Sequence, residues 1–141
     1  MKTVTINRLD KYVDKEIEIK GWVYNRRSVG KIWFLILRDG TGLLQCVVVD
    51  GECDKDTFNL EQELNQEDSV IVKGKVKKEP RAIGGYELGV SEVCVINHTT
   101  EEYPISKKDH GTDFLMSNGH LWLRSKRQNS IMRVRHAIVK A

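Results

Sequence analysis

GWVYNRRSVGKIWFLILRDGTGLLQCVVV, residues 21–49, is the most informative part of the sequence for predicting the fold. Residues 31–38 and 43–49 are rich in β-branched and aromatic side chains, which is typical of β-strands. The residues between them, DGTG at 39–42, are typical of a tight turn. The stretch therefore predicts two strands joined by a turn, preceded by the end of another strand that carries GWV.

Further strand-like segments lie on both sides of this pair. Residues 16–25, 69–76 and 86–97 alternate or concentrate apolar side chains as strands do. Residues 53–66 are acidic and compatible with a short helix. Five strands with a short helix between the third and fourth are the order of an OB-fold. We therefore expect an all-β, five-stranded OB-fold barrel over residues 1–97.

Glycines inside the predicted strands support a closed sheet. Gly21 and Gly74 occupy strand interiors, where glycine usually marks a bulge or a tight bend. Such bends allow a small sheet to curl and close. The side chains expected to fill the barrel or to close its ends are Leu9, Tyr12, Val13, Trp22 and Trp33.

The character of the sequence changes after Asn97. Residues 98–119 are polar and interrupted by proline and glycine, which predicts a linker. Ser125 and Gln128 fit a capping box, so a helix is expected to begin at Ser125. The apolar residues that follow at helical spacing are Ile131, Val134, Ile138 and Ala141. This stripe predicts that 120–141 is the start of a further, truncated domain or a helix that needs a partner.

Charge is distributed unevenly along the chain, whose formal net charge is +3. Residues 120–141 carry six basic side chains and no acidic one. Residues 50–68 hold eight carboxylates and one lysine, whereas 73–81 hold five basic side chains and one acidic. Such segregation suits a domain that presents one face to a polyanion. An ordinary solvated surface explains the same pattern equally well.

Cysteine usage and hydropathy indicate the compartment. Cys46, Cys53 and Cys94 form no CxxC pair, and we interpret them as reduced thiols of a cytosolic protein. Their spacing predicts no metal site. No apolar run approaches the ~20 residues that cross a bilayer, and the N-terminus lacks an apolar signal segment. We expect a cytoplasmic protein with no membrane partner.

Two blocks carry a resemblance to a known family. The first consists of Gly21-Trp22-Val23, Arg26-Arg27, Gly30, Phe34, Arg38-Asp39, Gly42 and Gln45. This ordered pattern resembles the anticodon-binding domain of the class II aminoacyl-tRNA synthetases for aspartate, asparagine and lysine. The second block, residues 120–141, resembles the entry into the catalytic domain of the asparagine branch, because aspartate enzymes tend to carry Asp at the position of Trp122. Gly119 departs from the arginine that the family usually has there.

The resemblance implies what this chain contains and what it lacks. The partner would be tRNA, contacted at its anticodon loop. The three catalytic motifs would lie further along, so no catalytic residue and no cofactor are expected in this chain. ATP and Mg²⁺ are implied for the whole enzyme, which would form a homodimer through its catalytic domain.

Phe34 and Gln45 are the leading candidates for base recognition. Alternation places Phe34 on the strand face opposite Trp33, and the resemblance implies that its ring stacks an anticodon base, worth about 1–3 kcal/mol. The alternative for Phe34 is core packing. Gln45 interrupts an apolar strand with a carboxamide, which can pair with a uracil edge. The resemblance implies a contact with the middle uridine, and the alternative is a glutamine facing water.

The remaining candidates are charged. Arg26 and Arg27 can bind phosphate or stack on bases, but clean alternation lets only one of them face RNA, and the resemblance favours Arg27. Glu87 is implied to contact an outer anticodon base, the alternative being an exposed carboxylate. The side chains expected to lie against RNA phosphates are Lys77, Lys78 and Arg81.

Three other functions compete with recognition by an asparagine enzyme. The first is the corresponding domain of an aspartate-tRNA ligase, which shares the middle base. The second is a free-standing OB module that binds single strands with little sequence preference. The third is a dimerisation module that works through the apolar stripe of 131–141.

Overall fold

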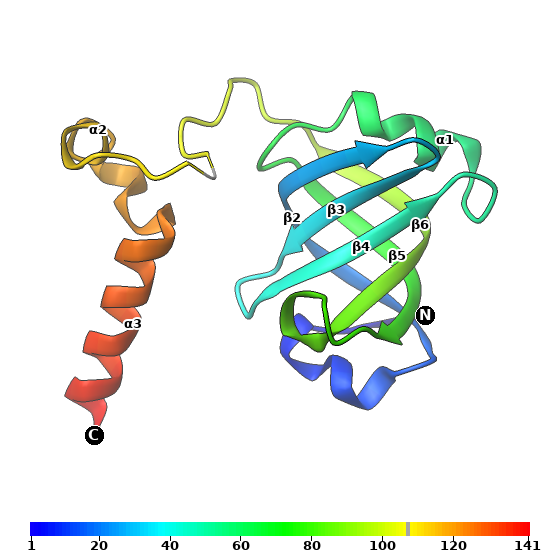
Figure 1. Ribbon diagram of the computed structural model, residues 1–141, viewed down its shortest axis with the longest axis horizontal. Helices are drawn as coiled ribbons and strands as arrows, with labels where there is room; N and C mark the ends of the chain where they lie inside the picture. The colour runs from blue at the N-terminus through cyan, green and yellow to red at the C-terminus, as the bar shows by residue number, and fades with distance from the viewer. Residues whose placement is uncertain (107) are drawn as a thin grey trace. The chain divides into compact units, whose positions relative to one another are not determined.

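The computed structural model describes residues 1–106 and 108–141, so one position of the predicted linker lies outside the described residues. The chain divides into two compact units, Met1–Glu102 and Tyr103–Ala141 (Figure 1). The first unit is a β-sheet with short helical segments at its ends. The second unit is helical.

The first unit is built on a closed sheet, as predicted. Its five long strands are β2 (Glu16–Val29), β3 (Ile32–Arg38), β4 (Leu43–Val49), β5 (Ser69–Lys78) and β6 (Tyr86–Asn97). They follow the order β2-β3-β4-β6-β5, and pairing of β2 with β5 closes the ring (Figure 1). All neighbours are antiparallel except β4 and β6, which run parallel. A short strand, β1 (Lys2–Thr3), adds to β2 in parallel and was not predicted.

The first long strand extends four residues beyond its predicted end. β2 continues to Val29 because its second half pairs with β3 after a register shift between Val23 and Asn25. Gly30, with φ +62°, then provides the turn into β3. β2 therefore pairs with β5 along its first half and with β3 along its second half.

Close approach of strands explains the two glycines inside the sheet. A Cβ on Gly21 would overlap the carbonyl oxygen of Arg38, and a Cβ on Gly74 would overlap that of Gly89. The register between β5 and β6 also shifts between Lys73 and Gly74. These positions let the sheet bend tightly enough to close.

The core lies inside the ring, on the inward face of each strand. β3 and β4 both alternate half-buried and buried side chains along their whole length. Leu35 and Leu37 are fully buried, and Trp33 is 1% exposed. Strand alternation therefore separated the two faces of β3 correctly, and Trp33, expected to fill the barrel or close one of its ends, is buried.

Helical segments close both ends of the ring. At one end, the 3-10 segment η1 (Ile6–Tyr12) buries Leu9 and packs Tyr12 against the core, as expected. At the other end lie α1 (Lys55–Asn59) and the 3-10 turn η2 (Leu60–Gln62), followed by the fully buried Leu64. The predicted acidic helix is thus real but short.

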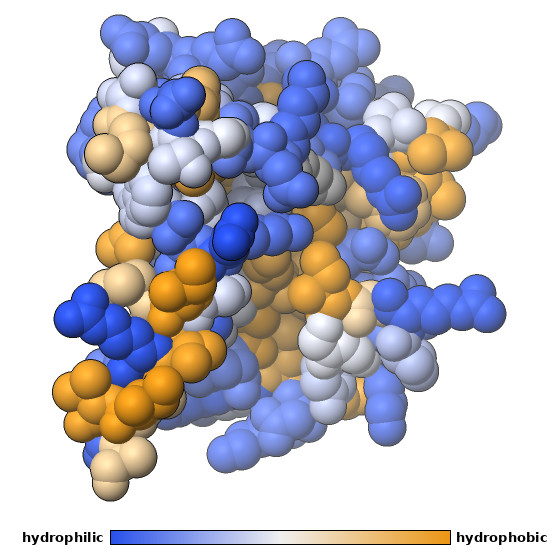
Figure 2. Space-filling model, turned by 60° about the vertical axis from the view of Figure 1, so that its left-hand side comes forward, coloured by the Kyte–Doolittle hydropathy of each residue, from blue (hydrophilic) through white to orange (hydrophobic). Residues whose placement is uncertain are grey.

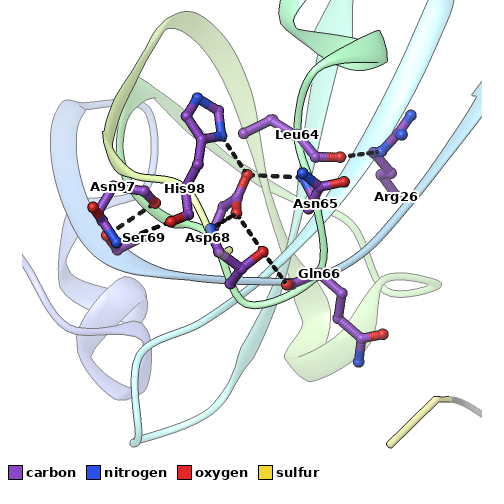
Figure 3. A network of polar contacts seen from close by, with 9 residues as sticks. Arg26, Leu64, Asn65, Gln66, Asp68, Ser69, Asn97 and His98 are labelled. Atoms are coloured by element: carbon purple, nitrogen blue, oxygen red, sulfur yellow. Dashed lines mark hydrogen bonds and ion pairs between the residues drawn. The ribbon is translucent and has the colours of Figure 1, made fainter. Parts of the chain in front are cut away.

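A buried carboxylate organises the connection between this second end and the last strand (Figure 3). Asp68 is fully buried and accepts hydrogen bonds from the backbone amides of Asn65 and Thr99, at 2.8 and 2.7 Å. It also accepts bonds from the Thr99 hydroxyl and from Nδ1 of His98. Burial acts to raise the pKa of Asp68, but these hydrogen bonds outweigh it and leave the pKa lowered.

The second unit contains more helix than predicted. Within the segment interpreted as a linker lies α2 (Thr112–Ser117). The 3-10 segment η4 (Gly119–Arg124) and the helix α3 (Lys126–Lys140) follow. In the first unit, a further 3-10 turn, η3 (Ile83–Gly85), immediately precedes β6.

The predicted capping box at the start of α3 is wrong. Ser125 is the N-cap residue, but its hydroxyl donates to the carbonyl of Trp122 instead of capping the helix. The apolar stripe is present and uncovered, with Ile138 at 71% and Val134 at 60% exposed. In Figure 2, where the helical unit comes forward, hydrophobic side chains lie uncovered on its surface. Among the described residues, no helix is long and apolar enough to span a bilayer.

Candidate nucleic-acid interface

Phe34 and Gln45 lie on the outer face of the ring, on the neighbouring strands β3 and β4. Both side chains are half-buried, whereas the residues beside them, Trp33 and Cys46, point into the core. In the register, Phe34 pairs with Val47, two residues from Gln45 on the same face. The ring and the carboxamide are therefore close neighbours on one surface.

Lateral pairing extends this surface onto the adjoining strands. Gln45 is opposite Ile36 on one side and Glu87 on the other, and Glu87 is opposite Lys77. One row across the ring therefore carries Asn25, Ile36, Gln45, Glu87 and Lys77. The adjacent row carries Arg27, Phe34, Val47 and Gly89. The two rows bring together five of the side chains that the sequence singled out for base or phosphate contacts.

Arg27 belongs to this face. It is paired with Phe34, and its guanidinium carbon lies 4.5 Å from the centroid of the phenylalanine ring. This is a cation–π contact, which also presents guanidinium donors beside the ring.

Arg26 turns away from that face. Its Nε donates to the carbonyl of Leu64 at 2.7 Å, and its guanidinium pairs with Glu61 at 3.2 Å (Figure 3 shows the first bond). Alternation along β2 separates the arginine pair, as expected, and joins Arg26 to the α1 end of the ring. The structure does not bring Arg26 together with Phe34 and Gln45.

The candidate phosphate contacts lie on β5 and on the loop after it. Lys77, Lys78 and Arg81 are all exposed. The side chain of Lys77 runs across Gly89, since a Cβ built there would be 3.3 Å from its Cε and 3.4 Å from its Nζ. The ammonium group is therefore held over the outer face beside Glu87.

The loop from 79 to 85 is ordered by its own backbone. The amide of Glu79 donates to the carbonyl of Gly85, and its carboxylate accepts from the amide of Arg81. Gly84 and Gly85 both have positive φ, which glycine adopts without strain. Ile83, the first residue of η3, is 49% exposed in this loop and was not among the residues predicted from the sequence.

The expectation that Trp22 fills the barrel or closes one of its ends is wrong. Its neighbours Gly21 and Val23 point inward, so Trp22 lies on the outer face and is 44% exposed. The guanidinium of Arg38 lies 5.5 Å from the ring centroid, and Arg38 also pairs with Glu67 at 2.8 Å. An outward indole is therefore partly covered by a cation instead of by the core.

The described residues contain no group of three or more His, Cys, Asp or Glu side chains that could hold a metal ion. All three cysteines are free, and burial raises the pKa of the Cys46 thiol well above its usual range. A low-pKa, reactive thiol is therefore not found at that position.

Comparison with known proteins defines the class. Residues 17–96 match the family model described as an OB-fold nucleic acid binding domain, which spans β2 to β6. The chain belongs to this family of tRNA anticodon-binding OB-fold domains. The matched region contains both rows of the outer face described above.

The relatives are asparagine–tRNA ligases. The chain is 52% identical over all 141 residues to the enzyme of Desulforamulus reducens, and covers 32% of that protein. It is 48% identical over 138 residues, or 98% of the chain, to the enzyme of Thermus thermophilus, again covering 32% of it. The chain thus spans about a third of the length of the curated relatives that it matches.

Solved structures of aminoacyl-tRNA synthetases superpose on this chain. The asparaginyl-tRNA synthetase of Pyrococcus horikoshii, complexed with asparaginyl-adenylate, superposes with a TM-score of 0.83 at 33% identity, over 99% of this chain and 33% of that one. An aspartyl-tRNA synthetase from Entamoeba histolytica superposes with a TM-score of 0.76 at 21% identity, over 97% of this chain and 35% of that one, which shows a common fold.

Proposed function

We propose that this chain is the anticodon-recognition part of an asparagine-specific tRNA ligase. The outer face of β3, β4 and β6 receives the unpaired bases of the anticodon loop. The observation that carries the proposal is the placement of Phe34 and Gln45 side by side on that face, with Arg27 and Glu87 at their flanks.

The chemistry of these side chains fits a single-stranded loop. Proteins grip unstacked bases by stacking them on aromatic rings and by hydrogen-bonding their edges. Phe34 stacks the middle base, which contributes about 1–3 kcal/mol. Gln45 offers one acceptor and two donors, and so matches a uracil edge in that position.

The charged side chains divide between selectivity and affinity. Glu87 accepts hydrogen bonds from an outer base and disfavours bases that offer none, because an unpaired carboxylate beside RNA is repelled. Arg27, Lys77, Lys78 and Arg81 neutralise phosphates, a contribution that weakens as salt rises. Arg26 supports the fold at the α1 end and serves RNA binding only indirectly.

The complete protein would be a class II ligase. It activates asparagine with ATP and Mg²⁺ as the adenylate and transfers it to the 3′ end of its tRNA. That chemistry belongs to parts outside this chain, and so does assembly into a homodimer through the catalytic domain. Identity of 48–52% to asparagine–tRNA ligases favours asparagine over aspartate. Whole-length matching within longer proteins favours a ligase part over a free-standing module.

Binding of two RNA hairpins tests this function. One has the asparagine anticodon stem-loop sequence, and the other replaces the middle uridine with cytidine. We expect the 141-residue chain to bind the uridine hairpin at least about fivefold more tightly, the lower end of one good base contact. Equal affinities would contradict base recognition and favour a sequence-blind OB module.

A further inference from the structure

The end of the ring closed by η1 carries four exposed cations that the base-binding face does not use. They come from β1, from η1 and from the turn before β2, and they are Lys2, Arg8, Lys11 and Lys15. We call these four residues the η1 cations. Within the part of the chain that the structure describes, none of them forms an ion pair with a carboxylate, in contrast to Lys75, which lies 3.7 Å from Asp14.

Tyr12 lies among the η1 cations: Lys2, Lys15 and Arg8 act on its side chain, and Lys11 precedes it in the chain. The ammonium groups of Lys2 and Lys15 lie 5.5 and 5.9 Å from the centroid of its ring. The pKa of Tyr12 is lowered, first by a hydrogen bond with Lys2 and then, against an opposing effect of burial, by the charges of Lys2, Lys15 and Arg8. A lowered phenol pKa is what a locally positive potential produces.

The patch is continuous with the predicted phosphate contacts. The amide of Asp14 donates to the carbonyl of Val76, and the amide of Val76 donates to the carbonyl of Lys15. Val76 immediately precedes Lys77 and Lys78. The η1 cations therefore extend the basic edge of β5 around this end of the ring.

The opposite end of the ring has the opposite charge. Residues 50–68, which include α1 and η2, hold eight carboxylates and one lysine. Acidic side chains also occur near the patch, at Asp10, Asp14 and Glu16, but they are fewer than the cations around them. A polyanion lying on the outer face is thus repelled from the α1 end and drawn toward the η1 end.

We propose that the η1 cations hold the phosphate backbone of the RNA stem that carries the recognised loop. The inference rests on the proposed function, and it adds a second, sequence-independent contact beyond the bases. Lysine and arginine on an exposed surface contact phosphate without reading sequence, so this patch contributes affinity and orientation. The loop is gripped on the sheet, and the paired stem leaves over the end that η1 closes.

Two probes separate the stem from the loop. One is the anticodon hairpin with its full stem, and the other is the seven-nucleotide loop sequence as a single strand. Lys11→Gln/Lys15→Gln is compared with the wild-type chain, and Lys20→Gln/Lys55→Gln is the matched control that removes the same charge elsewhere. All four lysines are exposed, so the thermal midpoints of both variants should match wild type.

We expect the Lys11/Lys15 variant to bind the hairpin about three- to tenfold more weakly, with a salt slope smaller by about two, or one per lost phosphate contact. Its affinity for the seven-nucleotide strand should be unchanged, and so should both affinities of the control. Wild-type hairpin binding by the Lys11/Lys15 variant, equal losses on both probes, or equal losses in the control would each overturn the proposal. Phe34→Ala should weaken both probes, and if it weakens neither, the proposed base-binding face is the part that fails.

Discussion

The guanidinium carbon of Arg27 lies 4.5 Å from the centroid of the Phe34 ring, across the pairing of β2 with β3. A cation therefore lies over the ring on the β2 side, while on its other side β3 pairs with β4, the strand that carries Gln45. A cation–π contact at an exposed site is worth about 0.5–1 kcal/mol, less than the stacking of a base. The contact can hold the ring in position and still yield to RNA.

Phe34→Ala should weaken binding of the anticodon hairpin by one to two orders of magnitude, since about 1–3 kcal/mol of stacking is lost. Fluorescence anisotropy with labelled hairpin measures the change. Ile71→Ala is the control, because Ile71 is also half-buried on a strand but pairs with Lys20 and Cys94, away from the base-binding face. Unchanged affinity of Phe34→Ala would count against this face.

Gln45→Ala should reduce discrimination between uridine and cytidine at the middle position more than it reduces the overall affinity for the hairpin. The carboxamide is the group expected to read the edge of the middle base, so the hairpins with uridine and cytidine should become equal within about twofold. The same binding titration, run on both hairpins, gives the ratio. A ratio that stays at the wild-type value would show that another group reads the base.

Substitution of the two adjacent arginines should have different effects, one on RNA binding and the other on stability. Arg27→Ala is expected to reduce hairpin affinity and to lower the salt slope by about one, with little change in thermal stability. Arg26→Ala should leave RNA binding intact and destabilise the fold by about 1 kcal/mol, because the Leu64 carbonyl and Glu61 lose their partner. Thermal denaturation beside titration distinguishes them, and the reverse assignment would refute the placement of both side chains.

Sequence periodicity was sufficient to predict the long strands and to divide each strand into two faces. A strand repeats every two residues, so Trp33, Leu35 and Leu37 fall on one face of β3 and Phe34 falls on the other. Both faces are apolar, so periodicity did not decide which one is inward, and only the resemblance to the synthetase domains favoured an outward Phe34. The same rule contained the answer for Trp22, which falls between the inward residues Gly21 and Val23. The indole lies outside because alternation along β2, and not the size of the side chain, sets its face.

Two polar contacts could not be predicted from the sequence pattern, one local and one made over a long sequence separation. The capping box at Ser125 failed because the Ser125 hydroxyl donates to the nearby carbonyl of Trp122 instead. Asp68 gave no signal within its acidic segment, since two of its partners, His98 and Thr99, lie about thirty residues further along. Only folding of β5 against β6 brings these groups together.

Gly74→Ala should destabilise the first unit, because the added Cβ meets the backbone of Gly89 and Val90 and no flexible side chain can yield. We expect a loss of about 1–3 kcal/mol or more, as in other overpacked sites, measured by urea denaturation. Gly111→Ala is the control, since a Cβ at that position would have no neighbour within 4 Å and its φ is −64°. Equal stability of the two variants would contradict the close strand crossing.

Asp68→Asn should destabilise the first unit at neutral pH and progressively less in acid. The carboxylate accepts hydrogen bonds at both oxygens, whereas an amide can accept at one only, so we expect a loss of about 3 kcal/mol at pH 7. Because the pKa of Asp68 is lowered in the folded chain, its stabilisation is complete above the ordinary aspartate pKa and is lost as pH falls through the lowered value. The free energies of unfolding of wild type and variant should therefore converge toward low pH. Asp10→Asn removes the same charge at an exposed position and should change the free energy of unfolding at pH 7 by no more than about 0.5 kcal/mol. A pH-independent gap between wild type and Asp68→Asn would contradict the assignment.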